Sequence, residues 1–241
     1  CSRRHDLVRA RGHPAPIRLL GPSPAGHRRP DAERVVDTGK MSAPRAVREP
    51  KQQRTRDAWA QILDVGLELF TEGGVAALTV SEVCRRTGTS PPSLYARVDG
   101  RRGLISAVYE VAMLRLRDHE HLIHEAADRE TTPRSRVAAV VDATAELYAR
   151  NRQLMRSVVA AGPFDDAIRI RGVEETQRFI GIVADSLGIE ETAAGDVAST
   201  VFASLVMVTT QGLGYAAPGA ETEESFRERL IRVAVARAFS S

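Results

Sequence analysis

Residues 78–95 read LTVSEVCRRTGTSPPSLY, and this stretch decides the fold of the chain. Thr79–Glu82 has the capping-box pattern that opens a helix. Gly88 suits the left-handed residue that ends a helix at a tight turn. Ser90 is a suitable N-cap for a second short helix, and the two prolines after it fit because the first helical turn needs no amide donors. The stretch therefore predicts two short helices joined by a turn.

Helical patterns continue on both sides of this stretch. Upstream, apolar residues recur at steps of three and four, and Gly73-Gly74 should stop that helix. Downstream, Asp99 should cap a helix that runs from Arg101 to about Asp128. No stretch alternates apolar and polar residues for long enough to indicate a strand, so the predicted fold class is all-α. The remaining helices are expected at Pro133 to about Arg150, Asn151–Ala161, Phe164–Leu187, Thr192–Ala216 and Glu223–Phe239.

Two short helices joined by a turn form the helix-turn-helix plan, in which the second helix lies in the major groove of DNA. Helix N-termini also present free amides to phosphate oxygens. The alternative is an ordinary helical corner with a solvated, charged face. We predict DNA binding through this motif because several arginines surround it, namely Arg85, Arg86, Arg97, Arg101 and Arg102.

The charge of the chain is unevenly distributed, although its formal total is only +3. Residues 1–50 carry 11 Lys+Arg against 5 Asp+Glu, a net of +6, whereas residues 106–241 carry 15 against 20, a net of −5. A polyanion should therefore bind to the N-terminal part of the chain. Residues 1–50 also hold 7 of the 12 prolines, so we expect a disordered, basic, Pro-rich extension. A natural start at Met41 is one interpretation of this segment, and a basic arm that adds non-specific DNA affinity is the other.

The motif, continued to Arg97 and Arg101, resembles the DNA-binding domain of the TetR family of transcriptional regulators. The likeness covers about residues 55–115 and includes the Gly-Gly helix end, the Thr cap and the Leu94-Tyr95 pair. It implies a three-helix helix-turn-helix DNA-binding domain at residues 51–115, with the motif at about 78–97. The family commonly has His-Phe where this chain has Arg97-Val98, and lysine where it has Arg101. Arginine at positions 97 and 101 keeps the phosphate contact. The implied contacts to DNA are Thr79, Tyr95, Arg97 and Arg101 toward phosphates, and Thr89, Ser90, Pro91, Pro92 and Ser93 on the recognition helix.

The resemblance further implies that residues 116–241 form an α-helical ligand-binding and dimerisation domain. The chain would then be a homodimeric, ligand-responsive repressor in the cytoplasm, with double-stranded operator DNA and a small apolar or amphipathic ligand as partners. It implies no cofactor, and the residues of the ligand site stay unassigned. The helix over 192–216 is apolar nearly all round, which indicates either a dimer seam or a central core helix. Its apolar residues are Val197, Val201, Leu205 and Val208 on one side, and Phe202, Val206, Thr209 and Leu213 on another.

The sequence gives little support for a cysteine metal site or for a membrane span. Cys1 and Cys84 lack metal-ligand spacing, and Cys84 is interpreted as a small core residue. The uncharged run Val197–Ala220 is long enough to span a bilayer, but polar residues and glycines interrupt it, so no membrane is expected.

No Gly-rich phosphate loop and no Ser/His/Asp grouping indicates an enzyme. The histidines of residues 119–124 are interpreted as surface groups rather than metal ligands. Met113, Met155 and Met207 either line an adaptable cavity or are plain core. The alternative function is a helical ligand carrier or enzyme with a vestigial helix-turn-helix.

Overall fold

The computed structural model describes residues 51–216 and 222–240, and these belong to one compact unit. The predictions for residues 1–50 lie outside the described residues. The described part is helical throughout and has no strand, which confirms the all-α class. The helices are α1 (Lys51–Ala77), α2 (Val80–Thr87), α3 (Pro91–Tyr95), α4 (Gly100–Arg117), α5 (His121–Asp128), α6 (Pro133–Arg150), α7 (Arg152–Ala161), the 3-10 turn η1 (Gly162–Phe164), α8 (Asp166–Leu187), α9 (Glu191–Gln211), α10 (Leu213–Ala216) and α11 (Glu223–Ala238).

The first helix breaks where the sequence predicts. Gly73 and Gly74 have non-helical backbone angles, and Gly74 has a φ of 63°, which a side chain would disfavour. A last helical turn then continues to Ala77. The break redirects the chain so that Leu78 enters the core with no exposed surface.

The predicted helix-turn-helix motif is present, and it consists of α2, α3 and the turn that joins them. Thr79 Oγ1 accepts a hydrogen bond from the Glu82 amide at 3.2 Å, and Gly88 ends α2 with a φ of 69°. Only half of the capping box is present, because the Thr79 amide bonds to the carbonyl of Ala77. Ser90 stands at the N-cap of α3 without a side-chain bond to an amide.

The predicted helix from Arg101 to Asp128 is wrong in length, since the structure has two helices there. After Arg117 the amides of His119 and Glu120 bond to carbonyls three residues back, which tightens the chain into a turn. No glycine or proline marks this turn, so the sequence carried no signal for it. Asp99 precedes α4 but makes no capping bond.

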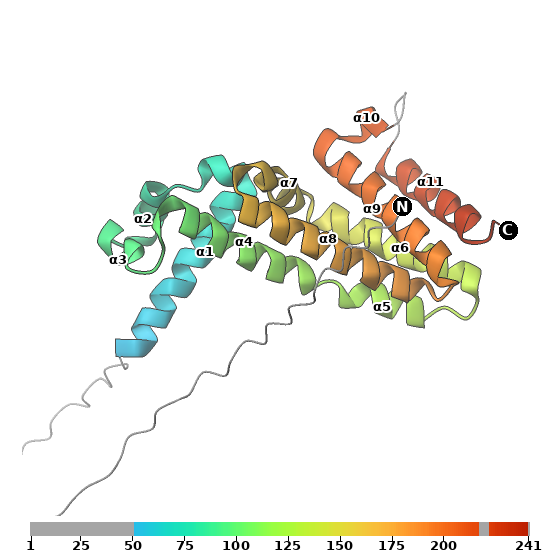
Figure 1. The fold of residues 1–241 in the computed structure, drawn as a ribbon, viewed down its shortest axis with the longest axis horizontal. Coiled ribbons are helices and arrows are strands. Elements are labelled where there is room, and N and C mark those ends of the chain that lie inside the picture. Colours follow the sequence, from blue (N-terminus) through green and yellow to red (C-terminus); the bar gives the residue numbers. More distant parts are fainter. Residues whose placement is uncertain (1–50, 217–221, 241) are drawn as a thin grey trace, which may run out of the picture. The chain divides into compact units, whose positions relative to one another are not determined.

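One face of α9 packs against other helices of the body, and the opposite face is exposed. This helix packs against α8 and α11, which lie beside it in Figure 1. It ends at Gly212, where φ is 86°, and not at Ala216 as the sequence suggested. Among the described helices, α9 alone is long and apolar enough to cross a membrane, with a mean hydropathy of 1.4. Its inward face is core, because Val197, Val201 and Leu205 are buried.

Candidate functional site

The short helix α3 is anchored by its apolar residues and exposes the others. Leu94 is fully buried and Val98 nearly so. The opposite face carries Pro91, Pro92 and Ser93, which are exposed, and Tyr95, whose surface is 53% exposed. The structure therefore brings most of the predicted recognition residues onto one open surface. Thr89, in the turn, is half-buried.

Few hydrogen-bonding groups on this surface are unoccupied. The hydroxyls of Ser90 and Ser93 lie 2.8 Å apart and bond to each other. The two prolines that lie between these serines offer no amide donor. Base reading by long polar side chains is accordingly limited on α3.

The two arginines of α2 are neutralised by acidic neighbours. Arg85 and Arg86 both donate to Glu82, and Arg86 also reaches Glu72 at 3.1 Å. Hydrogen bonds from Arg85 and then Arg86 lower the pKa of Glu82 to about 2, so it stays ionised at neutral pH. These arginines add less positive charge to the surface than their number suggests.

Arg97 and Arg101 are bound to the backbone of α1 and of the segment that follows it. Arg97 Nη2 donates to the carbonyl of Thr55 at 2.7 Å, and its guanidinium lies 5.5 Å from the ring centroid of Trp59. Arg101 donates to the carbonyls of Val75 at 2.6 Å and Leu78 at 3.1 Å. Both side chains therefore stabilise the packing of the motif, a role that sequence reasoning missed.

The start of α4 also contacts the corner between α7 and α8. The guanidinium of Arg101 lies 5.8 Å from the ring centroid of Phe164. Its neighbour Arg102 pairs with Asp165 at 2.7 Å, and Asp165 caps α8 through the amide of Ala167. The motif is thus tied to the body by two adjacent residues.

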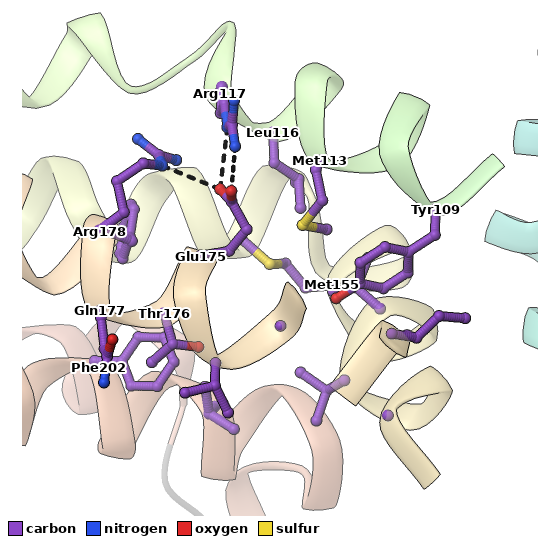
Figure 2. A pocket seen from close by; sticks show the side chains of 18 of the residues that line it. Tyr109, Met113, Leu116, Arg117, Met155, Glu175, Thr176, Gln177, Arg178 and Phe202 are labelled. Atoms are coloured by element: carbon purple, nitrogen blue, oxygen red, sulfur yellow. Dashed lines mark hydrogen bonds and ion pairs between the residues drawn. The ribbon is translucent and has the colours of Figure 1, made fainter. Parts of the chain in front are cut away.

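A pocket of about 530 Å³ opens in the body, between α4, α6, α7, α8 and α9 (Figure 2). Tyr109, Met113 and Leu116 of α4 line one side, and Met155 of α7 lines another. Of the two interpretations of the methionines, cavity lining or plain core, the pocket supports the first for Met113 and Met155, although both are also largely buried. The third methionine, Met207, is 43% exposed on α9 and does not line it.

An aromatic cluster forms a further wall of this pocket. The ring centroids of Tyr148 and Phe179 lie 6.0 Å apart, and each lies 6.4 Å from that of Phe202. Tilted and edge-on contacts at such distances are favourable for aromatic pairs. Burial raises the pKa of Tyr148, so its hydroxyl keeps its proton at every physiological pH.

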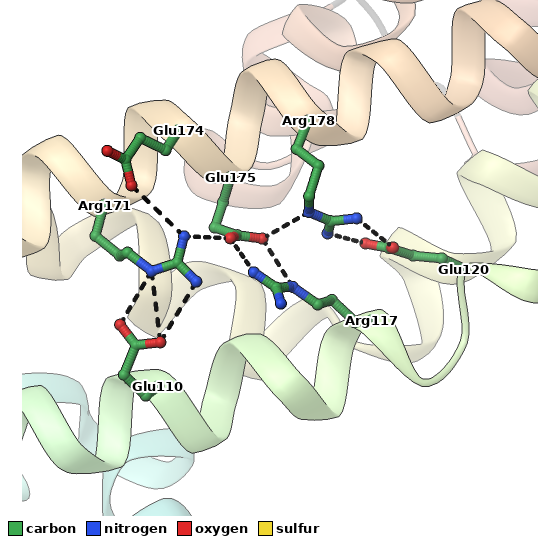
Figure 3. Close-up of polar contacts among 7 residues, drawn as sticks. All are labelled: Glu110, Arg117, Glu120, Arg171, Glu174, Glu175 and Arg178. Carbon is green, nitrogen blue, oxygen red and sulfur yellow. Dashed lines mark hydrogen bonds and ion pairs between the residues drawn. The ribbon is translucent and has the colours of Figure 1, made fainter. Parts of the chain in front are cut away.

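An ion cluster closes one end of the pocket and joins α4 to α8 (Figure 3). Glu175 is only 9% exposed and accepts hydrogen bonds from Arg117, Arg171 and Arg178. Arg178 also holds Glu120 at 2.6 and 2.8 Å. Burial alone would raise the pKa of Glu175, but the hydrogen bonds from Arg117, Arg178 and Arg171 outweigh it and lower that pKa to about 2. Periodicity carries no signal for this cluster, because its members come from separate helices.

The cluster predicts an acid-sensitive part of the folding stability. Glu175 has a folded pKa of about 2 against an ordinary value of 4.5, so its contribution is complete above pH 4.5 and is lost as the pH falls toward 2. That contribution should be about 2–3 kcal/mol. Urea unfolding at pH 7, 4 and 3 measures it, with Glu175→Gln as the control whose acid dependence should be smaller by this contribution, while that of other carboxylates such as Glu82 remains. An equal acid dependence in that variant would contradict the assignment.

The histidines of residues 119–124 do not converge. His121 Nδ1 faces the Asp118 carbonyl at 2.8 Å, and His124 Nδ1 lies 3.0 Å from the Ser186 hydroxyl. His119 Nδ1 is buried without a partner among the described residues. No cluster of His, Cys, Asp and Glu in the described segments has the geometry to hold a metal ion.

Comparison with known protein families gives a match in the N-terminal part of the chain. Residues 62–108 match the sequence profile of the bacterial regulatory proteins of the tetR family. No curated protein matches the chain in sequence.

Several solved structures share the fold. A TetR-like transcriptional regulator from Rhodococcus sp. RHA1 has a TM-score of 0.54 at 15% identity, over 74% of this chain and 94% of that one. A regulator of the TetR/AcrR family from Thermobifida fusca has the same score and identity, over 74% and 97%. The fatty acid degradation regulator FadR from Bacillus halodurans has a TM-score of 0.56 at 12% identity, over 74% and 94%. At these identities the likeness shows the fold alone.

Proposed function

We propose that this chain, whose residues 62–108 are a DNA-binding domain of the TetR family, is a cytoplasmic, homodimeric repressor that a small ligand releases from its operator. One observation carries the proposal: α4 belongs to both sites. It begins two residues after Val98, the last anchor of the motif, and Tyr109, Met113 and Leu116 in its later turns line the pocket. A ligand that prefers one position of α4 would thereby change the position of α3. The chain acts as a regulator rather than as an enzyme.

The proposal is tested by the DNA that the purified protein selects from its own genome. Sheared genomic fragments retained by the full chain should share a near-palindromic site, with half-sites about one helical turn apart or a multiple of it. A helical carrier with a vestigial motif would retain fragments without a common sequence.

Phosphate contacts should appear as a steep salt dependence of DNA affinity. Each contact adds about −0.9 to the slope of log affinity against log salt, so Arg101→Ala should flatten the slope by about one unit. Arg115→Ala, near the far end of α4, is the matched control and should leave the slope unchanged. Because Arg101 also bonds to Val75 and Leu78, melting curves must show that the variant stays folded. A slope equal to that of the original protein would remove Arg101 from the phosphate contacts.

The dimer is assigned to the outward faces of α9 and α11, which pack side by side. Leu205, 4% exposed, belongs to the protomer's own core and is no probe of the seam. The exposed residues of α9 instead include Ala203 and Met207, and those of α11 include Val233, which is 50% exposed, and Ala236. Apolar and small side chains at these positions would allow two copies to approach closely.

Met207→Arg should separate the dimer because it places two like charges, one per copy, against the partner's apolar surface. Light scattering should then give the mass of a monomer. Affinity for a two-half-site operator should fall about a hundred-fold, since the second half-site no longer binds intramolecularly. Leu114→Arg, at a 56% exposed position of α4, is the control and should stay dimeric. A dimeric Met207→Arg protein would place the seam elsewhere.

A further inference from the structure

We propose that the pocket takes an uncharged, largely apolar molecule that carries a hydrogen-bond-accepting oxygen. Its rings or chain would lie against the wall of Tyr148, Phe179 and Phe202, and its oxygen would face the hydroxyl of Tyr109. The inference rests on the proposed function only in treating this pocket as the effector site.

The closed end of the pocket offers no unpaired cation to a charged occupant. Its charged groups are Arg117, Arg178, Glu120 and Glu175, and each is paired within the cluster. The fifth charged residue of the lining, Arg169, is 58% exposed and pairs with Asp166 at 3.2 Å. A carboxylate ligand at the closed end would have to displace Glu175 from its arginines or stay unpaired in an apolar space. Either step costs several kcal/mol, because an unpaired buried ion is strongly unfavourable.

Two tyrosine hydroxyls of the pocket lining, those of Tyr109 and Tyr148, make no hydrogen bond to another described residue. Tyr109 as a residue is only 2% exposed, and its hydroxyl points toward the space beside Met155 (Figure 2). Burial, with the nearby Glu110 charge, raises the pKa of Tyr109, so the hydroxyl remains a donor. Buried hydroxyls are usually satisfied, and an acceptor oxygen on the ligand would satisfy this one.

Gly172 keeps the space in front of this hydroxyl open. A Cβ at this position would stand 3.1 Å from the Tyr109 oxygen, closer than ordinary contact. Gly172 also lines the pocket. The volume of about 530 Å³ is within the range of sites for small organic molecules.

Two fluorophores with the same ring system test the charge. N-phenyl-1-naphthylamine is uncharged, and 1-anilinonaphthalene-8-sulfonate adds a sulfonate to the same skeleton. Titrated into the full chain without DNA, the uncharged probe should bind at least about ten-fold more tightly, because the anion has no free cation to meet. Equal or tighter binding of the sulfonate would overturn the proposal, as would binding of neither probe.

Pocket-filling variants show where the probe binds. Val206→Trp should abolish binding of the uncharged probe, since Val206 lines the pocket. Leu114→Trp, at an exposed position of α4 outside the pocket and the dimer seam, is the control and should bind as before. Unchanged binding in Val206→Trp would place the probe elsewhere and overturn the assignment.

The tyrosine is tested with 6-propionyl-2-(dimethylamino)naphthalene, an uncharged probe with one carbonyl acceptor. Its emission moves to the red when the carbonyl accepts a hydrogen bond. Tyr109→Phe should weaken its binding about three- to ten-fold and move the bound emission to the blue. Tyr215→Phe, outside the pocket and 72% exposed, should do neither. An unshifted emission in Tyr109→Phe would remove the hydroxyl from ligand contact.

Glu175→Gln should reverse the charge preference, because it leaves Arg117 without a carboxylate partner among the described residues and takes one of the partners of Arg171 and Arg178. The sulfonate should then gain about ten-fold or more relative to the uncharged probe. If this variant does not fold, the pair of probes on the original protein still decides the question. No arm uses DNA, so a protein that selects an operator but binds no uncharged probe loses only this inference. A protein that binds the probe but selects no operator loses the proposed function.

Discussion

Glu175→Ala should lower the free energy of unfolding by about 3 kcal/mol, the low end of the cost of breaking a buried ion pair from one side. Glu175 is 9% exposed and is the common acceptor of Arg117, Arg171 and Arg178. Its removal leaves those guanidiniums facing one another without their shared anion. The arginine side chains keep 28–34% of their surface exposed, so water offsets part of the loss. The melting temperature should fall by about 6–12 °C for a unit of this size.

Glu174→Ala is the matched control for that loss. Glu174 precedes Glu175 on α8, is 62% exposed and lies 3.7 Å from Arg171. A solvated pair of this kind contributes little, so the variant should change the unfolding free energy by less than about 1 kcal/mol. Equal losses in the two variants would show that the cluster is a surface feature and does not hold α4 to α8.

The contrast between these neighbouring glutamates shows what the sequence could and could not predict. The motif was predictable because its signals are local. Thr79 caps the start of α2, Gly88 ends that helix with a left-handed residue, and the two prolines fit only at the start of a helix. Partners far apart in the chain were not predictable. Arg117 and Glu175 meet only after α4 and α8 pack, and no spacing in the chain distinguishes Glu175 from Glu174.

The same limit explains why the sequence did not reveal the intramolecular contacts of the motif's arginines or the end of α4. Sequence pattern places Arg101 beside DNA, but only the fold shows that its guanidinium already meets Val75, Leu78 and Phe164. The turn after Arg117 was missed because it keeps right-handed backbone angles and changes only the hydrogen-bond spacing. The methionines allowed a cavity as one of two interpretations, and only the tertiary structure shows that the pocket exists and where its boundaries lie.

A ligand in the pocket should weaken operator binding about 5- to 150-fold, the usual range of coupling between two sites. The corner between α7 and α8 gives a physical route for this effect. Gly162 and Ile168 on either side of the corner line the pocket, while Phe164 and Asp165 at its centre hold Arg101 and Arg102 at the start of α4. Movement of the corner therefore changes the position of the motif directly.

Removing the corner's hold on α4 should separate the two sites without destroying either. Asp165→Ser keeps a residue able to cap α8 but loses the ion pair with Arg102, and Phe164→Leu keeps an apolar side chain but loses the ring under Arg101. In the double variant, ligand and operator should each bind within about three-fold of the original, while their coupling falls to about two-fold or less. Asp166→Asn, which removes a charge that pairs with Arg169 and not with α4, should leave the coupling intact. Reciprocity supplies an internal check, because DNA must weaken ligand binding by the same factor that ligand weakens DNA binding. Coupling that survives in the double variant would mean that α4 is moved from its pocket-lining turns alone, through Tyr109, Met113 and Leu116.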